Sequence, residues 1–221
     1  MKRIVLLTGI LSAGTFLQAQ HCPAYYPMKT GDSWELSNYT AKDKLESTMT
    51  MEVLEGDGNS AEILATTKDD TGEQVSEAQF EVRCTDDGML VDVASMAPTS
   101  NMNQYEGMEI NIKGDQLEIP ATGNAGDALE GGKMEFQVLN NGVPIMTMKY
   151  YITHRKIAGF EDVECPLGTY NCMKISYNME FRGILSNTTK TINWFSPEIG
   201  IVKTATYNKK NKLQSYSLRS K

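Results

Sequence analysis

The chain has 221 residues, of which 40% are hydrophobic and 22% charged, with a formal net charge of −7 at pH 7. This composition is typical of a globular protein and excludes a disordered, collagen-like or coiled-coil chain. The acidic balance argues against a nucleic-acid-binding protein, because phosphate backbones are bound by a surplus of Lys and Arg on one face.

The first 19 residues have the organisation of a secretory signal peptide. Lys2 and Arg3 form a basic start, and the apolar stretch at 4–17 is shorter than the roughly 20 residues that span a bilayer. Cleavage is expected after Ala19, so we expect a periplasmic or secreted protein without a transmembrane segment. Lipid attachment at Cys22 is disfavoured, because the bulky His21 stands where such signals have a small residue.

Apolar and polar residues alternate along most of the remaining chain, which predicts strands with one buried face. In chain order, alternating runs lie at 34–40, 49–53, 78–84, 108–112, 134–138, 146–154 and 172–182. The only helix candidate is a short segment at 98–105. The Gly-, Ala- and Asp-rich segment at 114–132 is interpreted as a loop that crosses over between strands.

The breaks between these runs are rich in Gly, Asn and Asp, which tolerate the positive φ of tight hairpins. Tight turns join antiparallel neighbours, whereas parallel strands need long crossovers. We therefore predict one all-β domain at 20–221, after a signal peptide at 1–19. The predicted fold is a single curved antiparallel meander sheet, a half-barrel or open barrel, with about eleven strands and at most one short helix.

Four cysteines in an exported chain predict disulfides. Cys165 and Cys172 flank a turn-rich stretch, so their pairing is the most economical, and it leaves Cys22 to pair with Cys84. The cysteine spacings and the two histidines do not form a zinc pattern, so we expect no metal site and no cofactor.

The sequence does not assemble a catalytic set, and we expect a protein that is not an enzyme. Gly31-Asp32-Ser33 resembles the nucleophile block of Gly-Asp-Ser-Leu hydrolases, which leaves a hydrolase that uses Ser33 as a remote alternative. Those enzymes need a late catalytic His and an α/β fold, but the last histidine here is His154, within a strand. The favoured interpretation of Ser33 is a turn that leads into a strand.

Methionine is the compositional oddity, with 13 residues. Its flexible thioether suits surfaces that meet varied apolar partners, although the same residues can simply fill a β core. The candidate ligand-binding residues are Met49, Met51, Met146, Met148, Met173 and Met179.

Three stretches, at 25–35, 166–175 and 194–203, carry a family resemblance. The first reads YYPMKTGDSWE, the second PLGTYNCMKI and the third WFSPEIGIVK. Together they resemble the TapB-like family of exported Bacteroidota proteins, which is related to a domain of unknown function. The resemblance implies a curved antiparallel sheet similar to the half-barrels of periplasmic lipoprotein carriers. It implies no known activity, catalytic residue or cofactor.

Two functions remain open for this exported envelope protein. One is binding of an apolar small molecule or lipid on the concave sheet face, because no predicted helix covers that face. The alternative is a protein–protein interaction module that docks on an envelope protein through the same face or a sheet edge, with Tyr25, Tyr26 and Tyr39 as surface aromatics.

Overall fold

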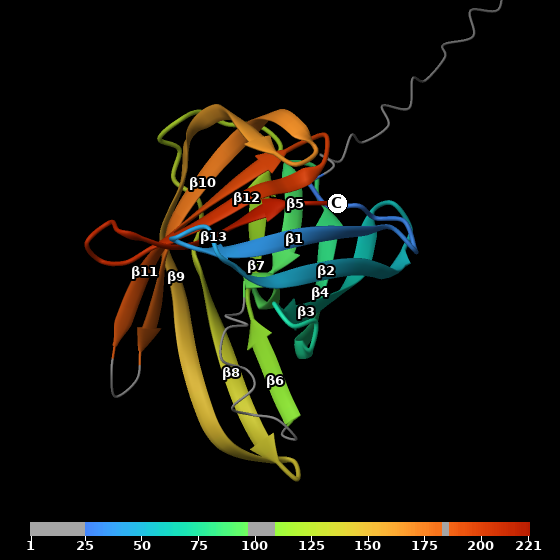
Figure 1. Ribbon diagram of the computed structural model, residues 1–221, viewed down its shortest axis with the longest axis vertical. Coiled ribbons are helices and arrows are strands. Elements are labelled where there is room, and N and C mark those ends of the chain that lie inside the picture. Colours follow the sequence, from blue (N-terminus) through green and yellow to red (C-terminus); the bar gives the residue numbers. More distant parts are fainter. Residues whose placement is uncertain (1–24, 97–108, 183–185) are drawn as a thin grey trace, which may run out of the picture.

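The computed structural model describes residues 25–96, 109–182 and 186–221, which form one antiparallel sheet (Figure 1). The strands are β1 (Ser33–Thr40), β2 (Leu45–Gly56), β3 (Ser60–Asp69), β4 (Gln74–Cys84), β5 (Gly88–Asp92), β6 (Glu109–Gly114), β7 (Gln116–Pro120), β8 (Gly132–Asn140), β9 (Val143–Cys165), β10 (Gly168–Arg182), β11 (Asn187–Ser196), β12 (Gly200–Tyr207) and β13 (Leu213–Arg219). A single 3₁₀ turn, η1 (Val93–Met96), follows β5.

The predicted all-β fold is confirmed, with thirteen strands in place of about eleven. One additional strand, β7, lies in the segment at 114–132 that was interpreted as a loop. Alternation accounts for the strands, since Ala61, Ile63 and Ala65 on β3 are buried while the residues between them are partly exposed. The helix expected at 98–105 lies outside the described residues.

The sheet is nearly closed into a barrel. Its order is β6-β8-β9-β10-β11-β12-β13-β1-β2-β3-β4-β5-β7. The two edge strands, β6 and β7, are consecutive in the chain and are separated only by Asp115. The chain therefore brings the two edges of the sheet together. In Figure 1 the long β8–β9 hairpin extends beyond the barrel on the side of β6.

Arg155 on β9 closes the seam between the edges of the sheet. Its guanidinium donates hydrogen bonds to the carbonyl oxygens of Glu118 on β7 and of Glu130, the latter at 3.3 Å. The segment before β8 also runs along β9, with the Leu129 amide 2.9 Å from the Arg155 carbonyl oxygen. The Arg155 side chain and these backbone hydrogen bonds thus connect β9 to β7 and to the segment before β8, although β7 and β9 are not neighbours in the strand order.

The residues before β1 close one end of the barrel. The Tyr26 ring packs edge-on against Trp34 and Phe80, with centroid distances of 6.0 and 6.1 Å. The Tyr25 hydroxyl donates to the Pro120 carbonyl oxygen at 3.2 Å. Both tyrosines are buried, so the expectation that they are surface aromatics is wrong.

A second core lies on the outer face of β11–β13. The tip of the β9–β10 hairpin supplies Val163, Cys165 and Cys172, which cluster with Trp194 and Val202. The register between β9 and β10 shifts twice, around Lys174 and Ser176. Such bulges bend and twist a strand pair, which allows the hairpin tip to lie over the outside of the barrel.

One predicted disulfide is wrong, because Cys165 and Cys172 are both free thiols. Cys165 lies opposite Gly168, whereas Cys172 lies opposite Glu161, four positions further along the hairpin. At roughly 3.3 Å per residue this offset is about 13 Å, and a disulfide requires Cα atoms within about 7 Å. Burial also raises the pKa of the Cys172 thiol to about 12.

The other predicted disulfide joins Cys22 to Cys84. Cys84 ends β4 with its Sγ 3.7 Å from Met28 Sδ, and it is not one of the free thiols. Cys22 lies outside the described residues, as does the signal peptide at 1–19. Both the Cys22–Cys84 bond and the cleavage after Ala19 therefore stay predictions.

Candidate functional site

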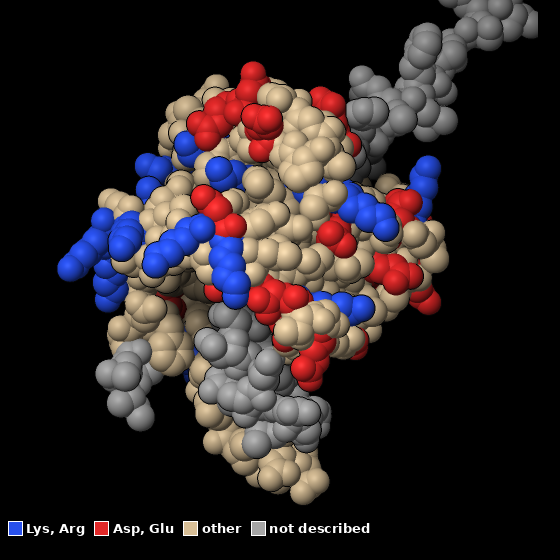
Figure 2. Space-filling model, in the orientation of Figure 1, with Lys and Arg blue, Asp and Glu red and all other residues tan. Residues whose placement is uncertain are grey.

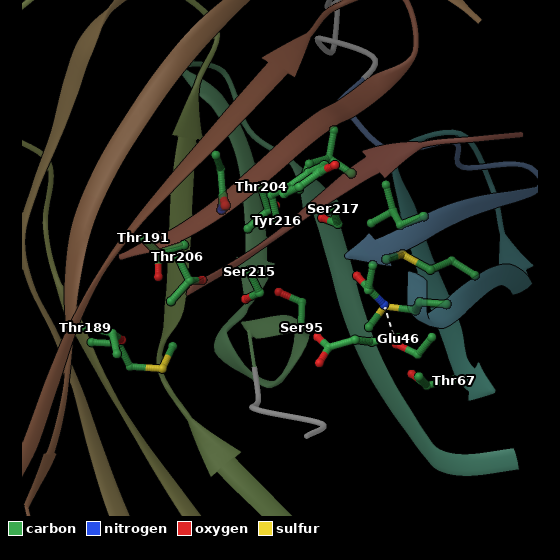
Figure 3. Close-up of a pocket in the computed structure, with 18 of the residues that line it drawn as sticks. Glu46, Thr67, Ser95, Thr189, Thr191, Thr204, Thr206, Ser215, Tyr216 and Ser217 are labelled. Atoms are coloured by element: carbon green, nitrogen blue, oxygen red, sulfur yellow. Dashed lines mark hydrogen bonds between the residues drawn. The ribbon is translucent and has the colours of Figure 1, made fainter. Parts of the chain in front are cut away.

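The barrel encloses a cavity of about 1020 Å³ (Figure 3). Its lining comes from the inner faces of β1–β4 and β9–β13, together with Tyr26 and Ser95. The exposed side chains of Glu46 and Asn187 also line it, so the cavity opens to solvent at the end opposite the N-terminal segment. We call this end the mouth, and the end closed by Tyr26 the floor.

The floor of the cavity is apolar. Tyr26, Met51 and Phe80 are all less than 8% exposed and belong to the main core. Leu36 and Ile201 continue this surface along β1 and β12. The deep end therefore offers an apolar guest a preformed surface.

A belt of polar side chains crosses the wall between the floor and the mouth. It consists of Asn193, Thr204, Ser217, Asn38, Ser47 and Asp69, on β11, β12, β13, β1, β2 and β3. Each member lies directly opposite the next in the strand register. We call this set the polar belt; one of its internal hydrogen bonds runs from Asn38 Nδ2 to Ser47 Oγ at 2.9 Å.

A second polar row lies one inward-facing position nearer the mouth. Thr191, Thr206 and Ser215 are paired across β11, β12 and β13, and all three line the cavity (Figure 3). Because side chains alternate between the two faces of a strand, both polar rows face inward. The wall of β11–β13 is therefore hydroxyl-rich, between apolar residues of β1–β4 and of β9–β10.

Two buried polar atoms of this lining have no hydrogen-bond partner among the described residues: Asn193 Oδ1 and Thr67 Oγ1. The exposed fractions of Asn193 and Thr67 are only 5% and 3%. An unsatisfied buried polar group costs about 1–3 kcal/mol. These atoms therefore mark places where a guest could complete the hydrogen bonding.

Two buried phenols of the lining, Tyr177 on β10 and Tyr26 at the floor, are held in their neutral form. Burial raises the pKa of Tyr177, and hydrogen bonds with Asn193 and Thr191 partly offset that rise. Burial also raises the pKa of Tyr26, with a smaller contribution from Tyr177. Both hydroxyls can donate a hydrogen bond at any physiological pH.

Charge at the cavity is unevenly distributed. The charged residues of the lining are Glu46 and Asp69, with neither Lys nor Arg among the described lining residues. Lysines lie outside the cavity, in the β1–β2 and β12–β13 turns, as Lys42, Lys44 and Lys212. In Figure 2 the blue side chains at the left cover the β12–β13 turn.

The six candidate methionines separate into two groups. Met49, Met51 and Met179 line the cavity. The Met173 side chain is buried in the main core, and Met148 packs against Phe136 on the β8–β9 hairpin. Met146 is 41% exposed on the same hairpin and does not line the cavity.

The hydrolase alternative finds no support around Ser33, which is exposed at the start of β1. His154 lies on β9 at a strand irregularity, with a φ of 52°. Its Nδ1 is 3.1 Å from Thr153 Oγ1 and 3.5 Å from Asn178 Nδ2. This histidine is therefore an exposed bulge residue with local partners. Within the described part of the chain, no group of three or more His, Cys, Asp or Glu could hold a metal ion.

The polar belt was missed by the sequence analysis, which looked for apolar residues on each strand. A weak signal exists in the run of Thr and Asn at 187–193 and the Thr and Ser residues at 204–206 and 215–217. Polar residues at every second position also describe a solvent-facing strand surface. Only the direction in which the sheet curls makes this face the inner one.

The strands form a nearly closed barrel with an internal cavity, and the comparisons place the chain in a family. The chain belongs to the DUF3108-like family, whose model matches residues 29–218. The TapB-like name expected from the three motifs is not supported by these comparisons. No protein among the curated sequences matches the chain.

Two solved structures share the fold. One is a candidate exported protein with a YmcC-like fold from Bacteroides fragilis, with a TM-score of 0.75 and 24% identity over 89% of this chain and 97% of that chain. The other is a candidate lipoprotein from Parabacteroides distasonis, with a TM-score of 0.80 and 22% identity over 91% of this chain and 99% of that chain. Among the described residues, none of the helices has the length and apolar character needed to span a bilayer.

Proposed function

We propose that this chain is an exported binding protein that holds an amphiphilic small molecule in its barrel, with the apolar part of the ligand against the floor. The observation that carries the proposal is the cavity of about 1020 Å³ with an apolar floor and a polar wall. Its volume is at the upper end of the roughly 300–1,000 Å³ of small-molecule sites. Burial of an apolar chain there would contribute roughly 25 cal/mol per Å².

Export is part of this proposal. It is supported by the basic start, the apolar stretch and the small residues around Ala19. Two proteins of the same fold are called candidate exported protein and candidate lipoprotein. The proposed role is binding or carriage without catalysis, because the cavity lining offers hydroxyl and amide groups with no histidine, cysteine or lysine among its described members.

The second candidate function is an interaction module for an envelope protein. It is favoured by the exposed apolar side chains of Val143 and Ile145, which are 62% and 54% exposed near the turn of the β8–β9 hairpin. This hairpin extends beyond the barrel (Figure 1). Exposed apolar groups on a projecting hairpin favour contact with another macromolecule.

Binding of the neutral fluorescent probe N-phenyl-1-naphthylamine tests the first candidate. We expect the purified mature protein to enhance its fluorescence saturably. Met179→Asp places a carboxylate in the half-buried lining and should weaken binding about tenfold, which corresponds to about 1.4 kcal/mol. Met146→Asp adds the same charge outside the cavity and should change the affinity less than about twofold.

Thermal unfolding of both variants provides the folding control. Loss of probe binding in Met146→Asp without loss in Met179→Asp would assign the probe to the β8–β9 hairpin and favour the interaction module. Failure of the folded wild-type protein to bind the probe would contradict the proposed cavity function.

A further inference from the structure

We infer that the cavity selects an amphiphile whose group next to the apolar chain is uncharged and hydrogen-bonding, such as a sugar or an amide, over one with a carboxylate there. This inference rests on the proposed binding function and specifies its ligand class. It concerns the level of the polar belt, where a guest seated on the apolar floor would place its first polar group.

The composition of the belt carries the first step. Two of its members are amides and three are hydroxyls. Amide and hydroxyl side chains each both donate and accept hydrogen bonds. A set of this kind matches a guest that also offers both donors and acceptors. A carboxylate accepts but does not donate, so it would leave the acceptor Asn193 Oδ1 unmatched.

The unpartnered atoms carry the second step. Asn193 Oδ1 is a buried acceptor without a partner among the described residues, and the Asn193 side chain lies beside the Tyr177 hydroxyl. Thr67 Oγ1, across the cavity on β3, is also buried and unpartnered. A guest that donates to Asn193 would satisfy an atom that the protein itself leaves unsatisfied.

Electrostatics carries the third step. The Asp69 carboxylate accepts hydrogen bonds from Thr71 and from the Glu73 amide, which lower its pKa and keep it ionised. Glu46 adds a second carboxylate to the lining. Because the described lining lacks Lys and Arg, a carboxylate at the belt would meet like charge without a counter-ion.

Matched detergents test this inference by displacement of bound N-phenyl-1-naphthylamine. Octyl glucoside and octanoate have eight-carbon chains and differ in the polar group, and both are used below their critical micelle concentrations. We expect octyl glucoside to displace the probe at a concentration at least about tenfold lower than octanoate. Equal displacement would overturn the inference. Stronger displacement by octanoate would also overturn it and would assign head-group choice to the lysines outside the mouth.

Two variants assign the preference to the belt. Thr204→Val removes a belt hydroxyl with little change of shape, and Thr50→Val is its control on the exposed face of β2. Asn193→Leu removes the buried amide, with exposed Asn171→Leu on β10 as its control. Each belt variant should lower the affinity for octyl glucoside at least about threefold, while the affinity for the probe stays within about twofold. The control variants should change neither affinity.

The outcomes separate this inference from the proposed function. The head-group inference fails while cavity binding stands in two cases. In the first, the probe binds but octyl glucoside does not displace it; in the second, both belt variants leave the affinity for octyl glucoside unchanged. If the probe does not bind the folded protein, the proposed function fails, and the inference fails with it. Thermal unfolding identifies a belt variant that does not fold. The octyl glucoside affinity of the other belt variant then tests the head-group inference.

Discussion

At the scale of single residues, Gly200 joins two of the three sequence motifs. It begins β12 with a φ of 81°, and a Cβ atom there would lie 2.2 Å from the Tyr25 carbonyl oxygen. The Tyr25 ring also packs edge-on against Phe195, at a centroid distance of 5.7 Å. Glycine at 200 therefore permits the N-terminal segment to lie against β12 and close the floor.

We expect Gly200→Ala to lower the free energy of unfolding by at least about 2 kcal/mol. A left-handed φ costs an L-residue roughly 1–2 kcal/mol, and the backbone clash adds to this cost. Gly58→Ala is the matched control, because Gly58 has a φ of 90° but no atom near its Cβ position. Urea unfolding compares the two variants, and equal losses would contradict a close approach at Gly200.

At the scale of elements, Glu161 and Trp194 connect the β9–β10 hairpin to the barrel. Trp194 Nε1 donates to Glu161 Oε1 at 2.5 Å, and Lys174 Nζ lies 3.3 Å from the same carboxylate. Lys174 and Lys203 lie over the Trp194 ring at 5.6 and 5.3 Å. These bonds, together with the second core, position the hairpin on β11.

The stability contributed by Glu161 is expected to depend on pH. Hydrogen bonds from Trp194 and Lys174 lower the pKa of Glu161 below its ordinary value of 4.5. The stability that the Glu161 carboxylate contributes to the fold is therefore complete above about pH 4.5, and it is lost as the pH falls through the lower pKa of the folded state. Glu161→Gln should cost about 1 kcal/mol at pH 7 and progressively less in acid.

Urea unfolding of wild type and variant between pH 7 and pH 3 measures this difference. Glu164→Gln, on the same strand with an exposed side chain, controls for the loss of one surface charge. A cost for Glu161→Gln that does not shrink below pH 4.5 would show that the carboxylate is not the group responsible.

At the scale of the whole molecule, closure of the barrel depends on Arg155. This side chain is 4% exposed, and burial lowers its pKa to about 10. It connects β9 to the Glu118 carbonyl oxygen on β7 and to the Glu130 carbonyl oxygen before β8. Backbone hydrogen bonds around 126–129 and 155–157 also cross this seam, as does the buried apolar cluster of Leu117 on β7 with Met134 and Ile152 on β8 and β9.

We expect Arg155→Ala to open the seam selectively. The two carbonyl oxygens would lose their donor, at about 1–3 kcal/mol for each group that stays buried. Amide hydrogen exchange should accelerate in β7 and at 121–131 more than in β11–β13. Lys156→Ala, an exposed neighbour on β9, should leave these rates unchanged, and uniform acceleration over the whole sheet would argue against a local seam.

The sequence by itself determined the local structure of this protein. Apolar and polar residues alternate within each strand, so residues 172–182 indicate a strand without reference to any partner. Asn141 and Gly142 likewise predict the β8–β9 turn, where both have positive φ, of 49° and 77°. Turn chemistry and alternation are set by adjacent residues, and an all-β antiparallel fold follows from them.

Tertiary structure alone decided closure, the cavity and the polar belt. Asn38 meets Ser217 only because β1 pairs with β13, and Met146 leaves the candidate site only because the β8–β9 hairpin extends beyond the barrel. The register of β9 and β10 likewise keeps Cys165 away from Cys172. Each of these outcomes depends on how strands pair and curve in space, whereas alternation reports only that a strand has two faces and leaves open which one the barrel encloses.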